Sequence, residues 1–137
     1  MKTEYIHKVK YYETDAMGIT HHSNYVRWME EARIEFMDNF GYSYKKLEGI
    51  GIASPVLGYN CEIKHSTKFD DIVKIIPSVI EYNSVRLKIE YTMFCNNKLI
   101  AKGETNHCFT NQSGLPIRLN KECFELDEKL KLELTND

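Results

Sequence analysis

A single acid and the start of a long helix lie close together near the N-terminus. The run YYETDAMGITHHSNYVRWMEEAR, residues 11–33, turns at Gly18 after Asp15 and opens the expected helix near His22 or Ser23. A carboxylate can attack an activated acyl group as a nucleophile or take a proton from water as a base. The first amides of a helix lack intrahelical partners and can stabilise the oxyanion that forms at an attacked carbonyl. The run therefore indicates acyl-transfer chemistry.

A structural role is the alternative for Asp15. Aspartate is common in turns, and residue types alone favour a carboxylate that merely orders this one. His21 and His22 follow, and we expect them to face different ways, one toward a substrate group or Asp15 and the other toward water. No HxxxH or HExxH spacing is present, so neither a metal ion nor another cofactor is expected.

Two cations on a later strand are candidates for binding phosphate. Arg86 and Lys88 are two residues apart, which points both side chains the same way on a strand, where they can meet the phosphates of a substrate. The simpler interpretation is a solvated strand face. The GxSxG elbow and the P-loop are absent, and no GxGxxG follows a strand, which disfavours serine hydrolases and nucleotide-binding folds.

One long amphipathic helix must position the N-terminal residues. Counted from Tyr25, apolar residues recur at intervals of three and four, which is the period of one helix face. That face contains Tyr25, Trp28, Met29, Ala32, Phe36 and Phe40. Ser23 or Asn24 can cap the start, and Gly41 can end the helix. A stripe this wide and aromatic predicts a helix pressed into a concave sheet.

The rest of the chain alternates with the period of β-strands. We expect strands over residues 3–12, 52–64, 72–82, 85–93 and 98–110. Asn96-Asn97 is a tight-turn signal, and residues 120–134 predict a charged helix or an irregular tail. One strand, one long helix and four following strands indicate an α+β fold in which an antiparallel sheet wraps a central helix.

The totals of the chain favour one soluble domain, residues 1–137. The 137 residues carry a net charge of −2, and 42% of them are hydrophobic, which suits a single globular core. No excess of positive charge favours nucleic acid as a partner, and no apolar run suits a signal peptide or a membrane helix. Four widely spaced cysteines without a CxxC motif are expected to be reduced thiols, so we predict a cytoplasmic protein.

The N-terminal run is similar to that of a known enzyme family. The segments YYETDAMG, HSNY and WMEEAR, which begin at Tyr11, His22 and Trp28, closely resemble the 4-hydroxybenzoyl-CoA thioesterase family. They look most like its bacterial branch of short acyl-CoA thioesterases, including those encoded beside the Tol-Pal envelope system. The later strand pattern also fits, so the resemblance covers about residues 5–118.

This resemblance implies a hotdog fold and homodimers or homotetramers with active sites at the subunit interface. It implies hydrolysis of acyl-CoA to a free acid and CoA, with Asp15 as nucleophile or general base. His22 matches a second catalytic position, where the side chain assists and the amide at the helix start polarises the thioester carbonyl. Tyr11 matches a tyrosine that lines the site, and Arg86 and Lys88 fall where relatives contact the CoA nucleotide.

Two more residues are expected to contact substrate. The Gly18 turn lets the backbone approach a ligand closely. Tyr25 can line an acyl tunnel, although an aromatic residue on this face can equally well fill the core. His21 occupies a position that is often aromatic in relatives, which leaves its role open.

Three alternatives to acyl-CoA hydrolysis stay open from the sequence. The substrate can be an acyl-carrier protein, which is acidic and would need a basic docking surface such as the one Lys45-Lys46 could provide. The domain can bind acyl-CoA without cleaving it, although such a sensor normally needs an output domain, and the presence of Asp15 and His22 argues against lost chemistry. The third alternative, a scaffold at the envelope, follows only from the resemblance.

Overall fold

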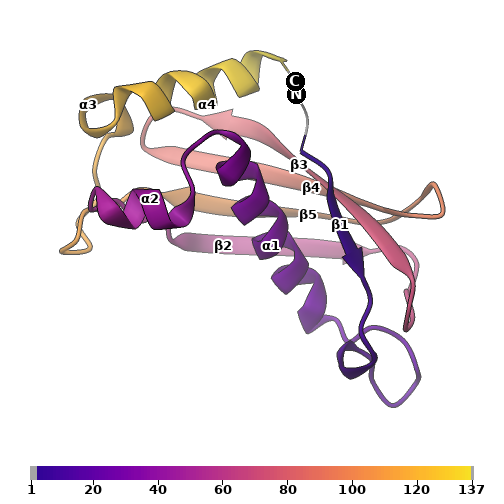
Figure 1. Cartoon of the computed structure of the whole chain (residues 1–137). Coiled ribbons are helices and arrows are strands. Elements are labelled where there is room, and N and C mark those ends of the chain that lie inside the picture. The colour runs from indigo at the N-terminus through magenta and orange to yellow at the C-terminus, as the bar shows by residue number, and fades with distance from the viewer. Residues whose placement is uncertain (1–2, 137) are drawn as a thin grey trace.

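One strand and one long helix precede four strands and a C-terminal helical segment in the computed structural model (Figure 1), which describes residues 3–136 and their side chains through residue 134. The elements are β1 (Tyr5–Lys8), the short 3-10 helix η1 (Tyr11–Glu13), α1 (Ser23–Asn39), α2 (Tyr44–Gly49), β2 (Val56–Ile63), β3 (Ile72–Tyr82), β4 (Arg86–Cys95), β5 (Lys98–Cys108), α3 (Leu119–Glu122) and α4 (Phe124–Asn136). This order agrees with the predicted α+β class.

The five strands form one antiparallel sheet in the order β1-β3-β4-β5-β2. Along β4, every second side chain is buried, as the clean alternation of its sequence predicts. The β4–β5 hairpin turns at Asn96 and Asn97, which both have positive φ angles, 52° and 62°, and asparagine tolerates that conformation. The two edges of the sheet are therefore β1 and β2.

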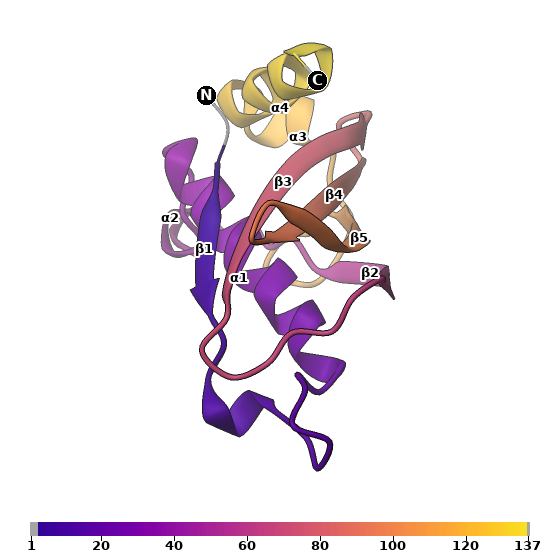
Figure 2. The ribbon, with the colours of Figure 1, turned by 90° about the vertical axis from the view of Figure 1, so that its right-hand side faces the viewer.

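Helix α1 lies on one face of the sheet (Figure 1), and in the turned view β1 and β2 lie to either side of it (Figure 2). Its inward face is the predicted one: Tyr25, Trp28, Met29, Ala32 and Phe36 are buried, together with Met37. Gly41 follows the helix with φ +80°, the left-handed conformation that ends a helix. The aromatic stripe thus fixes how α1 sits on the sheet.

A second helix makes the helical layer larger than predicted. α4 packs against β3 (Figure 1), so the picture of a sheet around one central helix is incomplete. Its buried Asp127 accepts hydrogen bonds from the hydroxyl groups of Tyr82 and Ser84 at the β3–β4 turn, and Lys131 of the same helix pairs with it at 3.0 Å. Residues 120–134 are therefore mainly an anchored helix, so the first of the two predicted alternatives, a charged helix, is confirmed and the irregular tail is not.

The expected first and second strands are both shorter than predicted. Residues 3–12 give only the four residues of β1, because the buried carboxylate of Glu13 accepts a hydrogen bond from the amide of Lys10 at 2.8 Å and folds the chain into η1. The strand expected over 52–64 begins only at Val56. Pro55 precedes it and has no amide hydrogen to donate to a sheet.

Candidate active site

Asp15 lies in the loop between η1 and α1, in the turn that the sequence predicts. Its Oδ1 accepts a hydrogen bond from the amide of Met17 at 2.8 Å, and its backbone amide donates to the carbonyl of Ile19 at 2.8 Å. Gly18 has φ +79°, and no atom lies within 4 Å of where a Cβ would stand. Backbone conformation, and not crowding, therefore requires glycine here. The half-buried carboxylate is held by its own turn.

Asn24 ties this loop to the helix, a role that the sequence did not reveal beyond a possible cap. Its side-chain amide donates to the carbonyls of Glu13 at 2.9 Å and His21 at 3.2 Å, while the amide of His21 donates to Glu13 at 2.8 Å. Asn24 is buried. The side chain of Asn24 therefore bonds to the backbone on both sides of the segment that contains Asp15, at Glu13 and at His21.

Glu13 is a buried acid that the sequence gave no reason to single out. Its carboxylate accepts hydrogen bonds from the Lys10 amide, from Trp28 Nε1 at 2.9 Å and from His7 Nε2 at 2.9 Å. Burial alone would raise the pKa of Glu13, but these hydrogen bonds outweigh it and lower the pKa. The carboxylate therefore stays charged and anchors η1 to β1 and α1.

The start of α1 leaves one amide for a ligand. The amide of Ser23 donates to His21 Nδ1 at 3.2 Å, that of Asn24 to the carbonyl of His21 at 3.0 Å, and that of Tyr25 to the carbonyl of His22 at 3.2 Å. Within residues 3–136, the structure records no acceptor for the amide of His22. His21 therefore acts as a cap, and the amide of His22 stays available to an acceptor from outside the described residues.

The two histidine rings lie on the same side, contrary to expectation. The rings of His21 and His22 stack with their centroids 4.2 Å apart, and both residues are exposed. His22 has helical backbone angles, so the alternation of a strand does not apply between the two residues. In the described part of the chain, neither ring has a recorded hydrogen bond to Asp15.

A cavity of about 460 Å³ opens beside the start of α1, and we call it the His22 cavity. It is lined by His22, Ser23, Val26 and Arg27 of α1 and by Tyr59, Cys61 and Ile63 of β2. β2 pairs only with β5 in the described sheet, so this cavity lies beside an open sheet edge.

The other predicted site residues lie in different surroundings. Tyr11 is exposed and its ring meets Phe69 edge-on at 5.6 Å. Tyr25 is buried in the core, and its hydroxyl hydrogen-bonds to Thr67 Oγ1 at 3.1 Å. The surroundings of Tyr25 are those of a core residue.

Arg86 and Lys88 do not join Asp15 within one chain. Lys88 pairs with Glu81 at 3.5 Å near the β3–β4 turn. The Asp15 loop meets the opposite end of β3, where Ile19 bridges Lys68. The 11 residues of β3, at about 3.3 Å each, put roughly 33 Å between these places. Within one chain, Lys88 therefore lies far from the Asp15 loop.

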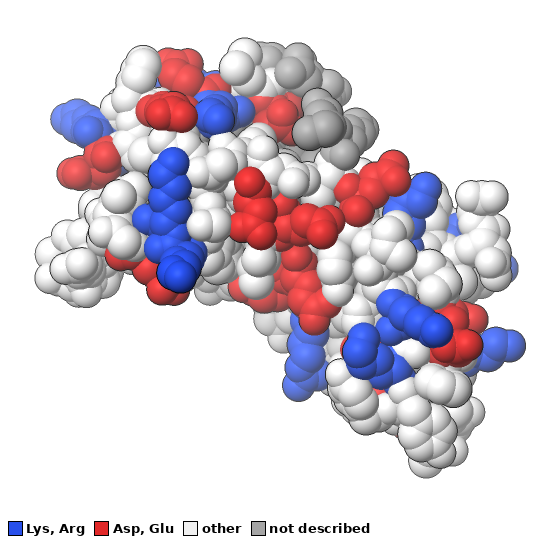
Figure 3. Space-filling view, viewed as in Figure 1, with Lys and Arg blue, Asp and Glu red and all other residues white. Residues whose placement is uncertain are grey.

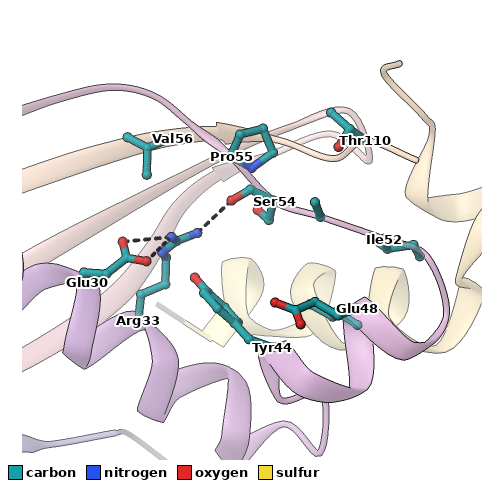
Figure 4. A pocket seen from close by; sticks show the side chains of 11 residues that line it. Glu30, Arg33, Tyr44, Glu48, Ile52, Ser54, Pro55, Val56 and Thr110 are labelled. Carbon is teal, nitrogen blue, oxygen red and sulfur yellow. Dashed lines mark hydrogen bonds and ion pairs between the residues drawn. The ribbon is translucent and has the colours of Figure 1, made fainter. Parts of the chain in front are cut away.

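A second cavity, of about 360 Å³, lies between the later part of α1, α2 and residues 52–56 (Figure 4), and we call it the Arg33 cavity. Arg33 donates two hydrogen bonds to Glu30, at 2.8 and 2.9 Å, and others to the carbonyl of Ser54 at 3.1 Å and to His107 Nδ1 at 3.0 Å. Burial, and then the charge of Arg33, lowers the pKa of His107 to about 3. In the sequence, Arg33 stands out only as the last residue of the motif WMEEAR. Its role was not predicted, because its partner His107 lies 74 residues away along the chain.

Within the described chain, no three histidine, cysteine, aspartate or glutamate side chains gather in a way that could hold a metal ion. All four cysteines are free thiols. None of the helices in residues 3–136 is both long and apolar enough to cross a membrane.

Residues 9–131 match the model of the thioesterase-like superfamily, and the chain belongs to that superfamily. YneP of Bacillus subtilis, whose name assigns it provisionally as an acyl-CoA thioesterase, is 30% identical over 116 residues, which is 83% of this chain and 84% of YneP. The prediction of a thioester hydrolase is therefore confirmed.

Solved structures agree with this assignment. The crystal structure of a hypothetical protein from Aquifex aeolicus has a TM-score of 0.85 at 35% identity and covers 90% of this chain and 97% of its own. That of a DHNA-CoA thioesterase from Staphylococcus aureus has a TM-score of 0.90 at 29% identity, with coverage of 98% and 91%. The five-stranded antiparallel sheet with its helices thus matches the predicted hotdog fold.

Proposed function

We propose that this protein hydrolyses acyl-CoA thioesters to a free carboxylic acid and CoA, with Asp15 as nucleophile or general base. The observation that carries the proposal is that Asn24 ties the Asp15 loop directly to the helix start, where the amide of His22 has no acceptor among the described residues. A thioester carbonyl bound to that amide would gain stabilisation as its oxygen becomes negative. Losing one donor of this kind typically costs about 3 kcal/mol.

The bond changes follow from these two groups. As a base, Asp15 takes a proton from water while the water oxygen attacks the thioester carbon. As a nucleophile, its carboxylate attacks that carbon and water later cleaves the resulting anhydride. In both routes the C–S bond breaks and the CoA thiolate leaves and takes up a proton.

The proposed enzyme is at least a dimer built on β2. β2 is an edge strand whose sequence, VLGYNCEI, contains one charged residue, Glu62. Four of its apolar side chains are 41 to 60% exposed: Val56, Leu57, Tyr59 and Ile63. Natural edge strands are usually protected by charge or proline. Antiparallel pairing with the same strand of a second chain would cover this edge and give a two-fold symmetric interface.

Such a dimer would complete each active site with residues from both chains. The His22 cavity lies at the Ile63 end of β2 and the Arg33 cavity at the Val56 end. A two-fold axis at the middle of β2 puts Val56 of one chain opposite Ile63 of the other. The His22 cavity of each chain then faces the Arg33 cavity of its partner.

Several observations favour acyl-CoA over a carrier protein as the substrate. The Staphylococcus aureus relative is named for a CoA thioester. Acidic side chains gather across the middle of the face in Figure 3, over α1, where Glu31 and Asp38 are exposed. This part of the surface would repel an acidic carrier protein.

Within the superfamily, the N-terminal motifs support the 4-hydroxybenzoyl-CoA thioesterase family, and its Tol-Pal branch stays a prediction.

The test is thiol release from short, medium, long and aromatic acyl-CoAs. We expect turnover by the wild-type protein and a loss of about 100-fold or more in kcat for Asp15→Asn, because the attacking or activating carboxylate is gone. Asp38→Asn, an exposed acid on α1, is the matched control and should keep full activity.

Three results would overturn the proposal in different ways. Near-normal turnover by Asp15→Asn would remove Asp15 from the mechanism. Tight binding of acyl-CoA by the folded wild-type protein without thiol release would instead favour the non-catalytic binding module. Turnover of acyl-carrier protein alone would identify the carrier-protein thioesterase.

A further inference from the structure

The Arg33 cavity contains two polar groups whose hydrogen-bonding capacity is unused. Arg33 Nε and the hydroxyl of Tyr44 are buried and have no hydrogen-bond partner among the described residues. In Figure 4 the Tyr44 side chain rises from α2 toward the Arg33 guanidinium, with its hydroxyl foremost. Leaving such a group unpaired costs stability, so buried polar groups nearly always have partners. Both residues line one cavity, so a ligand bound there is a candidate for the common partner of the two groups.

The charges around the cavity select the kind of ligand. Glu30 already neutralises Arg33 through two hydrogen bonds, and Glu48 adds a further negative charge to the lining. Burial raises the pKa of Tyr44, so its hydroxyl stays protonated and can donate. An anionic group would meet excess negative charge here, whereas an uncharged oxygen can accept from both free donors.

The rest of the lining is apolar. Leu47, Ile52, Ala53, Pro55 and Val56 surround the polar groups. A mainly apolar cavity with a few polar groups at one end is typical of a site for a small organic group. The expected ligand is therefore a hydrocarbon chain or ring that ends in an uncharged oxygen.

We propose that the Arg33 cavity binds the acyl group of a substrate held at the partner chain's Asp15, and that Arg33 and Tyr44 select acyl groups with an uncharged hydroxyl or carbonyl oxygen far from the thioester. This inference rests on the proposed thioesterase function and on the β2-paired dimer. Within one chain, Glu30 is eight residues along α1 from His22, about 12 Å. In the dimer, the cavity instead opens toward the His22 cavity of the other chain.

The experiment uses matched pairs of substrates. Butyryl-, hexanoyl- and octanoyl-CoA are compared with their terminally hydroxylated counterparts, and adipoyl-CoA supplies a terminal carboxylate. The variants are Tyr44→Phe and, as a control, Tyr42→Phe, because Tyr42 is a buried tyrosine of the same segment whose hydroxyl faces Cys123 and Glu125 instead. The value of kcat/KM is measured by thiol release for each substrate.

We expect the wild-type protein to prefer the hydroxylated member of at least one pair, and not to prefer adipoyl-CoA over hexanoyl-CoA. Tyr44→Phe should reduce the preference for the hydroxyl by about tenfold, the usual effect of one lost hydrogen bond, and Tyr42→Phe should keep it. Turnover without any preference, or a preference that survives Tyr44→Phe, would overturn this inference and leave the thioesterase intact. No thiol release from any substrate would overturn the proposed function itself.

Discussion

In the proposed site, His22 has two groups that can serve a substrate, its ring and its backbone amide, and mutation removes only the ring. The amide lies at the helix start without a recorded acceptor in the described chain, and a side-chain substitution leaves it in place. We therefore expect His22→Ala to lower kcat by about tenfold, less than Asp15→Asn, because oxyanion stabilisation survives. Single-turnover kinetics on the best acyl-CoA would measure this. A loss as deep as that of Asp15→Asn would show that the imidazole itself is essential.

Asn24 is expected to act on the reaction without touching the substrate. Asn24→Ala removes the two hydrogen bonds to Glu13 and His21, so we expect a loss of about 1–2 kcal/mol in unfolding free energy. The kcat should also fall, with KM nearly unchanged, because the Asp15 loop is released. Asn39→Ala, which removes a hydrogen bond to Thr3 at the other end of α1, is the control and should lower stability alone. Equal kcat in both variants would limit Asn24 to a structural role.

At the scale of single residues, the sequence predicted the features that depend only on neighbouring positions in the chain. Asp15 and Gly18 form one turn, and the turn signal lies within a few residues. Glu13 and Tyr44 escaped notice because their importance comes from burial and from partners brought together by the fold. A single sequence carries no mark that an acid or a tyrosine will lose contact with water.

Among the elements, the link between α1 and β5 should make stability depend on pH. His107 on β5 is buried and accepts from Arg33 on α1, and its pKa of about 3 lies below the ordinary 6.5. The unfolded chain therefore binds a proton between these pH values and the native state does not. The contribution of His107 to the free energy of unfolding is complete above pH 6.5. As the pH is lowered below 6.5, this contribution decreases by up to about 1.4 kcal/mol per pH unit.

Urea unfolding from pH 7 to pH 4 would test this link. His107→Gln should flatten the pH dependence, because glutamine can accept from Arg33 and donate to Thr105 without titrating. His65→Gln, at an exposed histidine, should retain the wild-type slope. An unchanged slope in His107→Gln would mean that His107 takes up its proton at the same pH in the native and the unfolded state.

Elements with a strong period were predicted well, and their ends were not. The stripe from Tyr25 to Phe40 and the alternation of β4 each repeat over many residues, so one exception does not hide them. β1 ended early because of Glu13, and β2 began late, at Val56, directly after Pro55. Tertiary hydrogen bonds and proline geometry decide such boundaries, and periodicity does not report them.

The whole molecule can be tested by mixing two defective chains. In the proposed dimer, Asp15 of one chain works with Tyr44 of the other. A mixed dimer of Asp15→Asn and Tyr44→Ala chains therefore contains one intact site and one doubly defective site. Random pairing of equal amounts should restore about a quarter of wild-type activity on a hydroxylated acyl-CoA.

Co-refolding the two variants and assaying the mixture against each variant alone would measure this restoration. Giving the two variants different affinity tags, and recovering both tags on one tag's resin after mixing, gives the control for exchange of subunits. Activity no higher than the average of the separate variants, with exchange demonstrated, would place both residues in the same chain's site.

The prediction of one domain over residues 1–137 stays a prediction, supported by a core that includes Val9 and Leu130.

The exposed edge strand β2 also affects the folding of a newly synthesised chain. In the proposed dimer, each chain presents an apolar strand with one charged residue until it meets a second copy, and such a strand can pair with unrelated unfolded chains. Partner encounter slows as the chains are diluted, which lengthens this exposed stage. We therefore expect the yield of refolded protein to be limited by competition between correct pairing and aggregation, and added charge on β2 to protect single chains while preventing activity.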